Sequence, residues 1–277
     1  VIDESLFVTG GGMQQVVLIR NQAGSAKILD EKSGAHSQTQ VPRESTALSK
    51  LFDPEANKRA VLFKTQLGNT WYFNLNPRAL RSPKVVGKFP VLLCEGDNLN
   101  KLLFSLHNEN PRLEKRILDA LKLVEPKADL FKFFSPDPDF ILFLLEDKHG
   151  HTFSPQSMSD GTLRYLVLCG LFALLDEWAR NKAPGPLIIF EEPENGLYVG
   201  NLKPLFAKLD FQSSSGQCIF TSHSPYFIDL FDAHVEGVHV MKPGMPSPSL
   251  TKPDPAKVQQ LLGDMPLGEL HYREMLQ

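Results

Sequence analysis

Apolar and polar positions alternate through residues 1–90 in a pattern that predicts mainly β structure. Two strands joined by a glycine turn are predicted for LFVTGGGMQQVVLIR (6–20). A second hairpin, turning at its Gly-Asn pair, is predicted for AVLFKTQLGNTWYFNL (60–75). The polar stretch between them, DEKSGAHSQTQVPRES (30–45), indicates a loop or a poorly ordered segment.

Apolar positions recur with helical spacing from Asp97 onward. Two short amphipathic helices are predicted for DNLNKLLFSLHNENPRLEKRILDALKLVEP (97–126). Asp97 or Asn98 can cap the first helix, and the second begins near Pro111.

A hairpin that turns at residues 148–150 is predicted for FILFLLEDKHGHTF (140–153). His149 and His151 in this turn could be a fragment of a metal site. The chemistry of a strand turn accounts for both histidines more simply, and we expect that explanation to hold.

The remaining chain alternates helices with short apolar strands. A helix apolar nearly all round, capped by Ser159 or Asp160, is predicted for 159–180 and should be buried. Then follow a strand at 187–190, a helix at about 200–208, the strand QCIFTSH and a helix that has Pro225 in its first turn. This order predicts a parallel sheet with crossover connections.

The composition is that of an ordinary globular protein, with 277 residues of which 42% are hydrophobic and 22% charged. This length suits one large domain or two small ones. The net charge is −3, from 29 basic and 32 acidic residues, so no overall basic field indicates nucleic acid. A local basic patch for DNA is not excluded.

The cysteines indicate a reducing compartment. Cys94, Cys169 and Cys218 form no CxxC pair and lie in apolar runs, so we expect buried thiols. No apolar run is long enough to span a membrane, and no signal peptide opens the chain. We therefore expect a cytoplasmic protein without a membrane partner.

Charged and polar residues follow two of the predicted parallel strands. Glu191-Glu192 comes directly after one strand, and Ser222-His223 after the next. Because functional groups in parallel sheets gather at the carboxyl ends of strands, two carboxylates and an imidazole should meet there. One carboxylate can hold Mg²⁺, the other can activate water, and the histidine can contact a transferred phosphoryl group.

Each of these features also has a structural explanation. The EEPE sequence can be an acidic helix start, and a single histidine after a strand is often structural. Ser159-Asp160-Gly161-Thr162 can be an ordinary helix cap, or a cradle for phosphate at a helix amino end. The joint occurrence of acids and histidine on successive strands favours the functional interpretation.

Three motifs in order resemble those of ABC-type ATPases. MSDGTLR (158–164) resembles the signature motif, LIIFEEPENGL (187–197) the Walker B strand with its D-loop, and CIFTSHSPYFID (218–229) the switch strand with its H-loop. The residues of these motifs are similar to those of the SMC/RecF-like branch, above all to those of the bacterial "predicted ATPase" AAA-family proteins. Weaker resemblance extends to WYFNLNPRALR (71–81), EGDNLNKLLFSL (95–106) and LGEL.

The resemblance implies an α/β P-loop NTPase fold of the ABC/SMC head type, with a parallel or mixed sheet core, an antiparallel β region and a small helical insertion. The whole chain, 1–277, is then one ATPase head. We expect 1–96 to be the β-rich part of lobe I, 97–132 the helical insertion, and 133–277 lobe II.

The resemblance also implies roles for single residues. Glu191 takes the Walker B position that serves Mg²⁺, Glu192 is the catalytic glutamate, and His223 is the switch histidine. The signature residues, which contact ATP held by a second subunit, are Ser159, Asp160 and Gly161. The D-loop residues are Asn195, Gly196 and Leu197. Such heads work as nucleotide-bound homodimers.

Two departures from the family pattern stand out. Tyr198-Val199 replaces the usual His-Pro after the D-loop. No Walker A motif GxxxxGK[ST] is present, since Gly10-Gly11-Gly12 lacks the following Lys-Ser/Thr and Gly87-Lys88 is followed by Phe-Pro. We expect the phosphate-binding loop upstream of Val1 in a longer natural chain, so that this chain alone binds ATP poorly.

The leading hypothesis is an ATPase whose nucleotide state is coupled to DNA or to an effector protein, in DNA repair or phage defence. The alternative is a non-catalytic regulatory or interaction module that retains these motifs. A metal-dependent nuclease built on Glu191, Glu192, Glu194 and His223 is a third reading, which no further acidic cluster supports.

Overall fold

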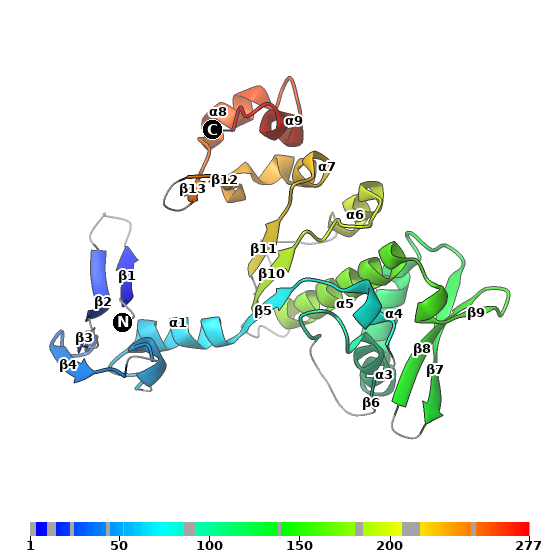
Figure 1. Ribbon diagram of the computed structural model, residues 1–277, viewed down its shortest axis with the longest axis horizontal. Helices are drawn as coiled ribbons and strands as arrows, with labels where there is room; N and C mark the ends of the chain where they lie inside the picture. The colour runs from blue at the N-terminus through cyan, green and yellow to red at the C-terminus, as the bar shows by residue number, and fades with distance from the viewer. Residues whose placement is uncertain are drawn as a thin grey trace. The chain divides into compact units, whose positions relative to one another are not determined.

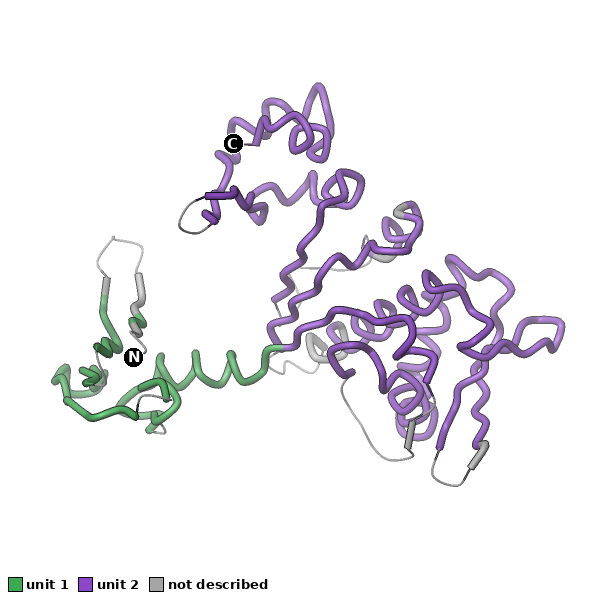
Figure 2. Tube along the Cα trace, in the orientation of Figure 1, with its two compact units in different colours: residues 1–70 green, residues 71–277 purple. Residues whose placement is uncertain are grey.

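The computed structural model describes residues 4–9, 15–22, 25–42, 45–51, 53–82, 84–85, 92–137, 140–180, 185–206, 217–244 and 248–276. The chain forms two compact units, Val1–Thr70 and Trp71–Gln277 (Figure 2). The glycine run 10–12 and Gly87-Lys88, both considered for a Walker A loop, lie outside the described residues.

Unit 1 is built on a four-stranded antiparallel sheet in the order β1-β2-β3-β4 (Figure 1). Its elements are β1 (Glu4–Thr9), β2 (Gln15–Gln22), β3 (Ser25–Leu29), β4 (His36–Gln40), the 3₁₀ helix η1 (Leu48–Lys50) and α1 (Lys58–Gly68). Ala26 and Ile28 alternate inward on β3 and join Leu18 and Ile19 of β2 in a small apolar core. The two strands of the predicted first hairpin are confirmed by their antiparallel pairing, and its glycine turn lies outside the described residues.

The predicted second hairpin is wrong, because α1 occupies its first half. In a strand Ala60 and Leu62 would share one face, but Ala60 is 2% exposed and Leu62 is 67% exposed. The residues Lys, Arg, Ala, Leu and Gln favour a helix. Gly68-Asn69 ends this helix instead of turning a hairpin, and the Asn69 N–H donates to the carbonyls of Thr65 and Gln66.

The polar segment 30–45, expected to be a loop, contains the strand β4. All five residues of β4 are exposed, so no apolar alternation marks the strand in the sequence. Its backbone pairs with β3 from Ser25↔Gln40 to Leu29↔His36. The turn before it has Gly34 at φ +73, a conformation that glycine adopts readily. This polar edge strand is held by backbone pairing and by the side chains of Ser37 and Gln38, which donate to the Ile28 carbonyl and to Ser25 Oγ.

Unit 2 begins with β5 (Thr70–Phe73), α2 (Pro77–Leu80) and the predicted helical pair, α3 (Leu99–Glu109) and α4 (Pro111–Leu121). Asn98 is the N-cap residue of α3, although its side chain accepts from the Leu93 N–H rather than from the helix. Asn110 caps α4 through the Leu113 N–H, at 3.1 Å. Both predicted helices are confirmed.

A small antiparallel sheet follows, made of β6 (Lys84–Val85), β7 (Ala128–Asp137), β8 (Phe140–Asp147) and β9 (Thr152–Phe153). The predicted hairpin between β8 and β9 is confirmed, with Gly150 at φ +81 in its turn. The Asp147 carboxylate accepts from the N–H groups of His149 and His151 and contacts the His151 ring at 3.1 Å. The two histidines are therefore part of a hydrogen-bonded turn.

The 3₁₀ helix η2 (Pro155–Ser157) leads into α5 (Asp160–Arg180), which is the central helix of the unit. Its buried residues cover nearly all its faces from Leu163 to Leu175, as predicted. They belong to one large core that also contains Phe73 of β5 and Phe190 of β10.

The sheet that carries the predicted motifs has the order β11-β10-β5 (Figure 1). Strand β10 (Leu187–Glu191) runs parallel to β11 (Gln217–Thr221), in register from Leu187↔Gln217 to Glu191↔Thr221. Along the sequence, α6 (Val199–Phe206) connects β10 to β11, and α7 (Pro225–Ile228) follows β11 with Pro225 in its first turn. The predicted α/β class and its parallel strands are confirmed.

The C-terminal segment packs on the helix that follows β11. It comprises η3 (Asp229–Gly237), β12 (Val240–Lys242), β13 (Ser249–Thr251), α8 (Pro255–Leu261) and α9 (Leu267–Tyr272). Asp229 accepts from the Gly268 N–H at 2.7 Å, and Asp232 accepts from the Leu267 N–H at 3.0 Å. A Cβ at Gly268 would collide with the Pro225 carbonyl, so glycine permits this close contact between α9 and α7. No helix of the described residues is long and apolar enough to cross a membrane.

Candidate functional site

The carboxyl ends of β10 and β11 bring the predicted acids and the histidine together. Glu191 pairs with Thr221 as the last rung of the parallel ladder, and the Glu192 N–H donates to the Thr221 carbonyl at 3.0 Å. Beyond this hydrogen bond the two strands diverge. The chain after β10 enters the Glu-Pro-Glu turn, and the chain after β11 leads to α7. Glu192 and His223 face each other across the gap, with 3.7 Å between Glu192 Oε1 and His223 Nε2.

Glu191 has partners that the sequence pattern did not single out. The Tyr72 hydroxyl and the Asn74 amide, at 3.1 Å, both donate to Glu191 Oε2. The hydrogen bond to Glu191, together with desolvation, raises the pKa of Tyr72. Both donors lie in WYFNLNPRALR, a segment that showed family resemblance without any residue role. Among the described residues, none donates to the other oxygen, Oε1.

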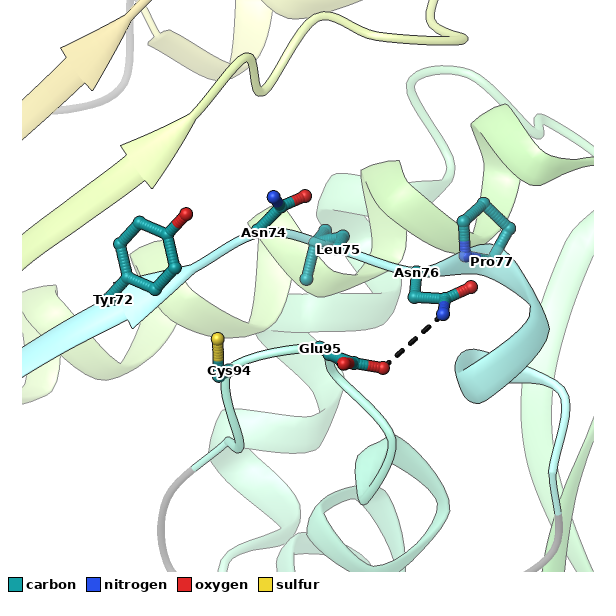
Figure 3. A pocket seen from close by; sticks show the side chains of 7 residues that line it. All are labelled: Tyr72, Asn74, Leu75, Asn76, Pro77, Cys94 and Glu95. Atoms are coloured by element: carbon teal, nitrogen blue, oxygen red, sulfur yellow. Dashed lines mark hydrogen bonds between the residues drawn. The ribbon is translucent and has the colours of Figure 1, made fainter.

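A cavity of about 460 Å³ opens beside this contact, where the chain after β5 passes the turn before α3 (Figure 3). Figure 3 shows Tyr72, Asn74, Leu75, Asn76, Pro77, Cys94 and Glu95 around it. Cys94 is exposed here, whereas the apolar run around it predicted a buried thiol. The reason is a turn, closed by the bond from the Gly96 N–H to the Leu93 carbonyl, that turns Cys94 outward. Cys169 is buried as expected, whereas Cys218 is only half-buried, and the desolvation it has raises its pKa to about 11.

Glu192 has a strained backbone. Its φ of +43 is in the left-handed region, which glycine favours and a glutamate adopts at a cost of about 1 kcal/mol. The Asn195 side-chain amide donates to Glu192 Oε2, and the Asn195 N–H donates to the Glu192 carbonyl at 3.1 Å. The conformation turns the side chain of Glu192 away from that of Glu191, toward His223. Non-glycine residues in this conformation concentrate at functional sites.

Glu194 differs from the other two acids because it is only 8% exposed. Ser222 Oγ donates to Glu194 Oε1, while Oε2 finds no hydrogen-bond donor among the described residues. The three crowded carboxylates therefore have separate surroundings. Glu191 faces β5, Glu192 faces His223, and Glu194 is buried against the chain that follows β11.

The predicted signature residues form the start of α5. The Ser159 hydroxyl accepts from the Thr162 N–H at 3.0 Å, so Ser159 is the helix cap. Asp160 forms an ion pair with Arg81, at 2.6 Å, and the same guanidinium donates to the carbonyls of Pro77 and Met158. Arg81 thus links α2 to the turn before α5. No sequence signal indicated this role.

The predicted signature glycine, Gly161, and the predicted D-loop approach each other closely within one chain. A Cβ built on Gly161 would lie 2.7 Å from the Gly196 carbonyl oxygen and 3.5 Å from the Leu197 side chain. Gly196 itself has φ +74, and the Leu197 N–H donates to the Glu194 carbonyl at 2.9 Å. Gly161 is needed for this approach, and Gly196 for the turn that makes it.

Four phenylalanines pack behind the site. Phe206 of α6, Phe220 of β11, Phe227 of α7 and Phe231 of η3 contact one another with ring centroids 5.4–6.0 Å apart. Phe190 of β10 contacts Phe73 of β5 at 5.6 Å. These rings fix the helices that carry the turns on both sides of the site.

The donors present fit a magnesium ion bound together with phosphates. Glu191 is exposed at the strand end, and no group of three or more His, Cys, Asp or Glu in the described part of the chain could hold a metal by itself. Mg²⁺ commonly takes one or two carboxylates, with waters and substrate phosphates completing its shell. The exposed carboxylate of Glu191 can supply one ligand of such an ion.

Comparison with known proteins assigns a family to most of the chain. The model of a family described as "AAA domain, putative AbiEii toxin, Type IV TA system" matches residues 28–229. This range includes the predicted signature residues at the start of α5, Glu191, Glu192 and His223. No curated protein matches the chain.

Among solved structures, the chain is similar to several SMC ATPase heads. One comes from work on ATP-driven dimerization and DNA stimulated activation of SMC ATPases, at 12% identity and TM-score 0.41, covering 59% of this chain and 96% of that one. Another is an Smc head bound to the C-winged helix domain of ScpA, at 14% and 0.49, covering 88% and 69%. A third is the Pyrococcus yayanosii Smc head with a coiled coil and joint, at 14% and 0.41, covering 62% and 31%.

Proposed function

Because the chain belongs to the AAA domain family described as putative AbiEii toxin of a Type IV TA system, an ATPase-type nucleotide-binding family, we propose that it hydrolyses ATP with Mg²⁺. Membership of this family agrees with the predicted class of ABC/SMC-like P-loop ATPases. The observation that carries the proposal is the placement of Glu192 and His223, 3.7 Å apart at the ends of two adjacent parallel strands.

The residues of the site divide the work. Glu191, oriented by Tyr72 and Asn74, would hold the magnesium ion, which neutralises charge on the phosphates when bound. Glu192 orients the attacking water and accepts its proton. His223 donates from its ring to the transferred phosphoryl group, from the opposite side of the gap.

We also propose that the active form is a homodimer joined through nucleotide. Ser159, Asp160 and Gly161 would then contact ATP bound by the partner copy, with the D-loop residues Asn195, Gly196 and Leu197 at the same surface. The close approach of Gly161 to Gly196 supports this arrangement, because it holds the proposed signature residues next to the proposed D-loop residues on one surface. The dipole at the amino end of a helix such as α5 also favours phosphate.

The proposed domain division is one ATPase head, with 1–96 in lobe I, 97–132 as the helical insertion and 133–277 as lobe II. The family description as a toxin supports coupling of the nucleotide state to an effector protein, and DNA is the second candidate partner.

ATP hydrolysis by the full-length protein, before and after Glu192→Gln, tests the proposal. The amide cannot accept the proton of water, so turnover should fall at least about a hundredfold while ATP binding and the nucleotide-bound dimer persist. Glu55→Gln, at an acid whose side chain is 77% exposed in unit 1, is the matched control. Undiminished turnover of Glu192→Gln contradicts the catalytic role. A wild-type protein that binds ATP without hydrolysing it supports the non-catalytic alternative.

A further inference from the structure

A chain of hydrogen bonds links the buried Glu194 to the turn that carries His223. Ser222 Oγ donates to Glu194 Oε1 and accepts from the Ser224 N–H at 2.9 Å. Ser224 in turn caps α7, accepting from the Phe227 N–H at 3.4 Å. His223 sits between the two serines, so the Ser222 hydroxyl closes the backbone around it.

His223 depends on this turn for its position. Its side chain is 94% exposed, and it approaches Glu192 at 3.7 Å. With so little of the imidazole covered by the described residues, the backbone direction at residues 222–224 determines where the ring points. The Ser222 hydroxyl is the group that sets this direction.

Glu194 is costly for stability where it stands. Burying a carboxylate costs several kcal/mol unless hydrogen bonds compensate, and here Oε1 has one donor while Oε2 has none among the described residues. An apolar residue of similar size would fill the space at lower cost. A role in stability alone therefore does not explain the carboxylate.

We propose that Glu194 and Ser222 are a positioning pair that fixes the separation of Glu192 and His223. Glu194 lies two residues after Glu192, and Ser222 lies one residue before His223, so their bond ties the two turns together beyond the last rung of the sheet. The pair rests on the proposed hydrolysis of ATP and deepens it. Both residues act through their neighbours, Glu192 and His223.

Kinetics of the full-length protein test the pair. Ser222→Ala and Glu194→Ala should each lower kcat about 10- to 100-fold, with the KM for ATP changed by less than about twofold, because the reacting groups are misplaced while binding groups stay. Ser222→Thr keeps the hydroxyl and Glu194→Gln keeps an acceptor, so both should recover most of the wild-type kcat. Failure of these conservative variants to recover activity overturns the pair.

A double-mutant cycle separates positioning from general damage. In a His223→Ala background, Ser222→Ala should cause almost no further loss, because the residue through which it acts is gone. Fully additive losses would show that Ser222 acts independently of His223, which contradicts the proposal. The thermal unfolding midpoints of all variants identify any variant that fails to fold.

Amide hydrogen exchange gives a readout that needs no turnover. The Ser224 N–H donates to Ser222 Oγ, so its exchange should accelerate at least about tenfold in Ser222→Ala and in Glu194→Ala. The Gly268 N–H, bonded to Asp229, is the control and should not change. If the wild-type protein lacks ATPase activity, the proposed function is wrong, but the exchange rate of the Ser224 N–H still tests the pair of Glu194 and Ser222. Unchanged exchange at Ser224 in both variants overturns it.

Discussion

Gly161 and Gly196 lie so close that a single methyl group on Gly161 would reach within 2.7 Å of the Gly196 carbonyl oxygen. The start of α5 and the turn after β10 therefore support each other within one chain. Any displacement of one segment is passed to the other through backbone atoms, which have no rotamers to adjust. The two segments behave as one rigid surface.

Gly161→Ala should lower the free energy of unfolding by about 1–3 kcal/mol, because the new methyl group meets backbone rather than a flexible side chain. Gly170→Ala is the matched control in the same helix, where no other described segment comes within 4 Å of the added Cβ. There alanine should be neutral or stabilising by up to about 1 kcal/mol. Denaturant unfolding measures both, and equal effects of the two changes would contradict the close contact.

The left-handed backbone of Glu192 predicts an unusual order of stability among its variants. Glu192→Gly and Glu192→Ala both remove the carboxylate, but only glycine relieves the strain at φ +43. The glycine variant should be more stable than the alanine variant by about 0.5–1 kcal/mol, whereas at most strand or helix positions the order is reversed. Thermal unfolding decides, and the usual order would place Glu192 outside the left-handed region.

Tyr72→Phe removes the phenol that donates to Glu191 and should weaken divalent-metal binding. The loss of a residue that orients a metal ligand commonly costs about 10- to 100-fold in metal affinity. We expect this range for Mn²⁺ in the presence of ATP, measured by electron paramagnetic resonance of the full-length protein. Tyr226→Phe, at a tyrosine that is 72% exposed, is the control. Unchanged Mn²⁺ affinity in Tyr72→Phe would show that Tyr72 does not orient a metal ligand.

The turn between β8 and β9 predicts a pH-dependent contribution to stability. Desolvation raises the pKa of Asp147, but hydrogen bonds from His151 and His149 outweigh it and hold the pKa below its usual 3.8. Since the folded pKa is the lower one, the stabilisation is present above about pH 4 and is lost as pH falls through the folded pKa. Asp147→Asn should therefore be destabilising at pH 7, and the difference from wild type should shrink toward pH 3. A difference that is independent of pH would contradict the shift.

Those parts of the fold that follow local rules were predictable. Asn110 and Ser159 mark helix starts through their side-chain caps, and the structure places helices there. The apolar run before Glu191 forms a strand in which Ile188 and Phe190 are buried and Leu187 and Ile189 are half-buried, which agrees with the unbroken apolar pattern. In these places, local chemistry and tertiary packing agree.

The missed elements depend on contacts between distant segments or on pairing that leaves no pattern. Strand β4 is wholly polar, and only its backbone partner β3 makes it a strand. Helix α1 has apolar residues at both strand and helix spacing, and Leu62 stays exposed, so burial gives no guide. Tyr72 lies 119 positions before its partner Glu191, a distance over which sequence spacing carries no information.

The contact of α9 with α7 has a consequence for where the chain can be cut. Asp229 and Asp232 lie just after the turn that carries His223, and their oxygens accept from N–H groups at Gly268 and Leu267. Removal of the residues from Leu267 onward would strip these bonds and expose the Pro225 carbonyl that Gly268 covers. Proteolysis within residues 262–266 would therefore act on the site from outside it, by loosening the helix on which the histidine turn rests.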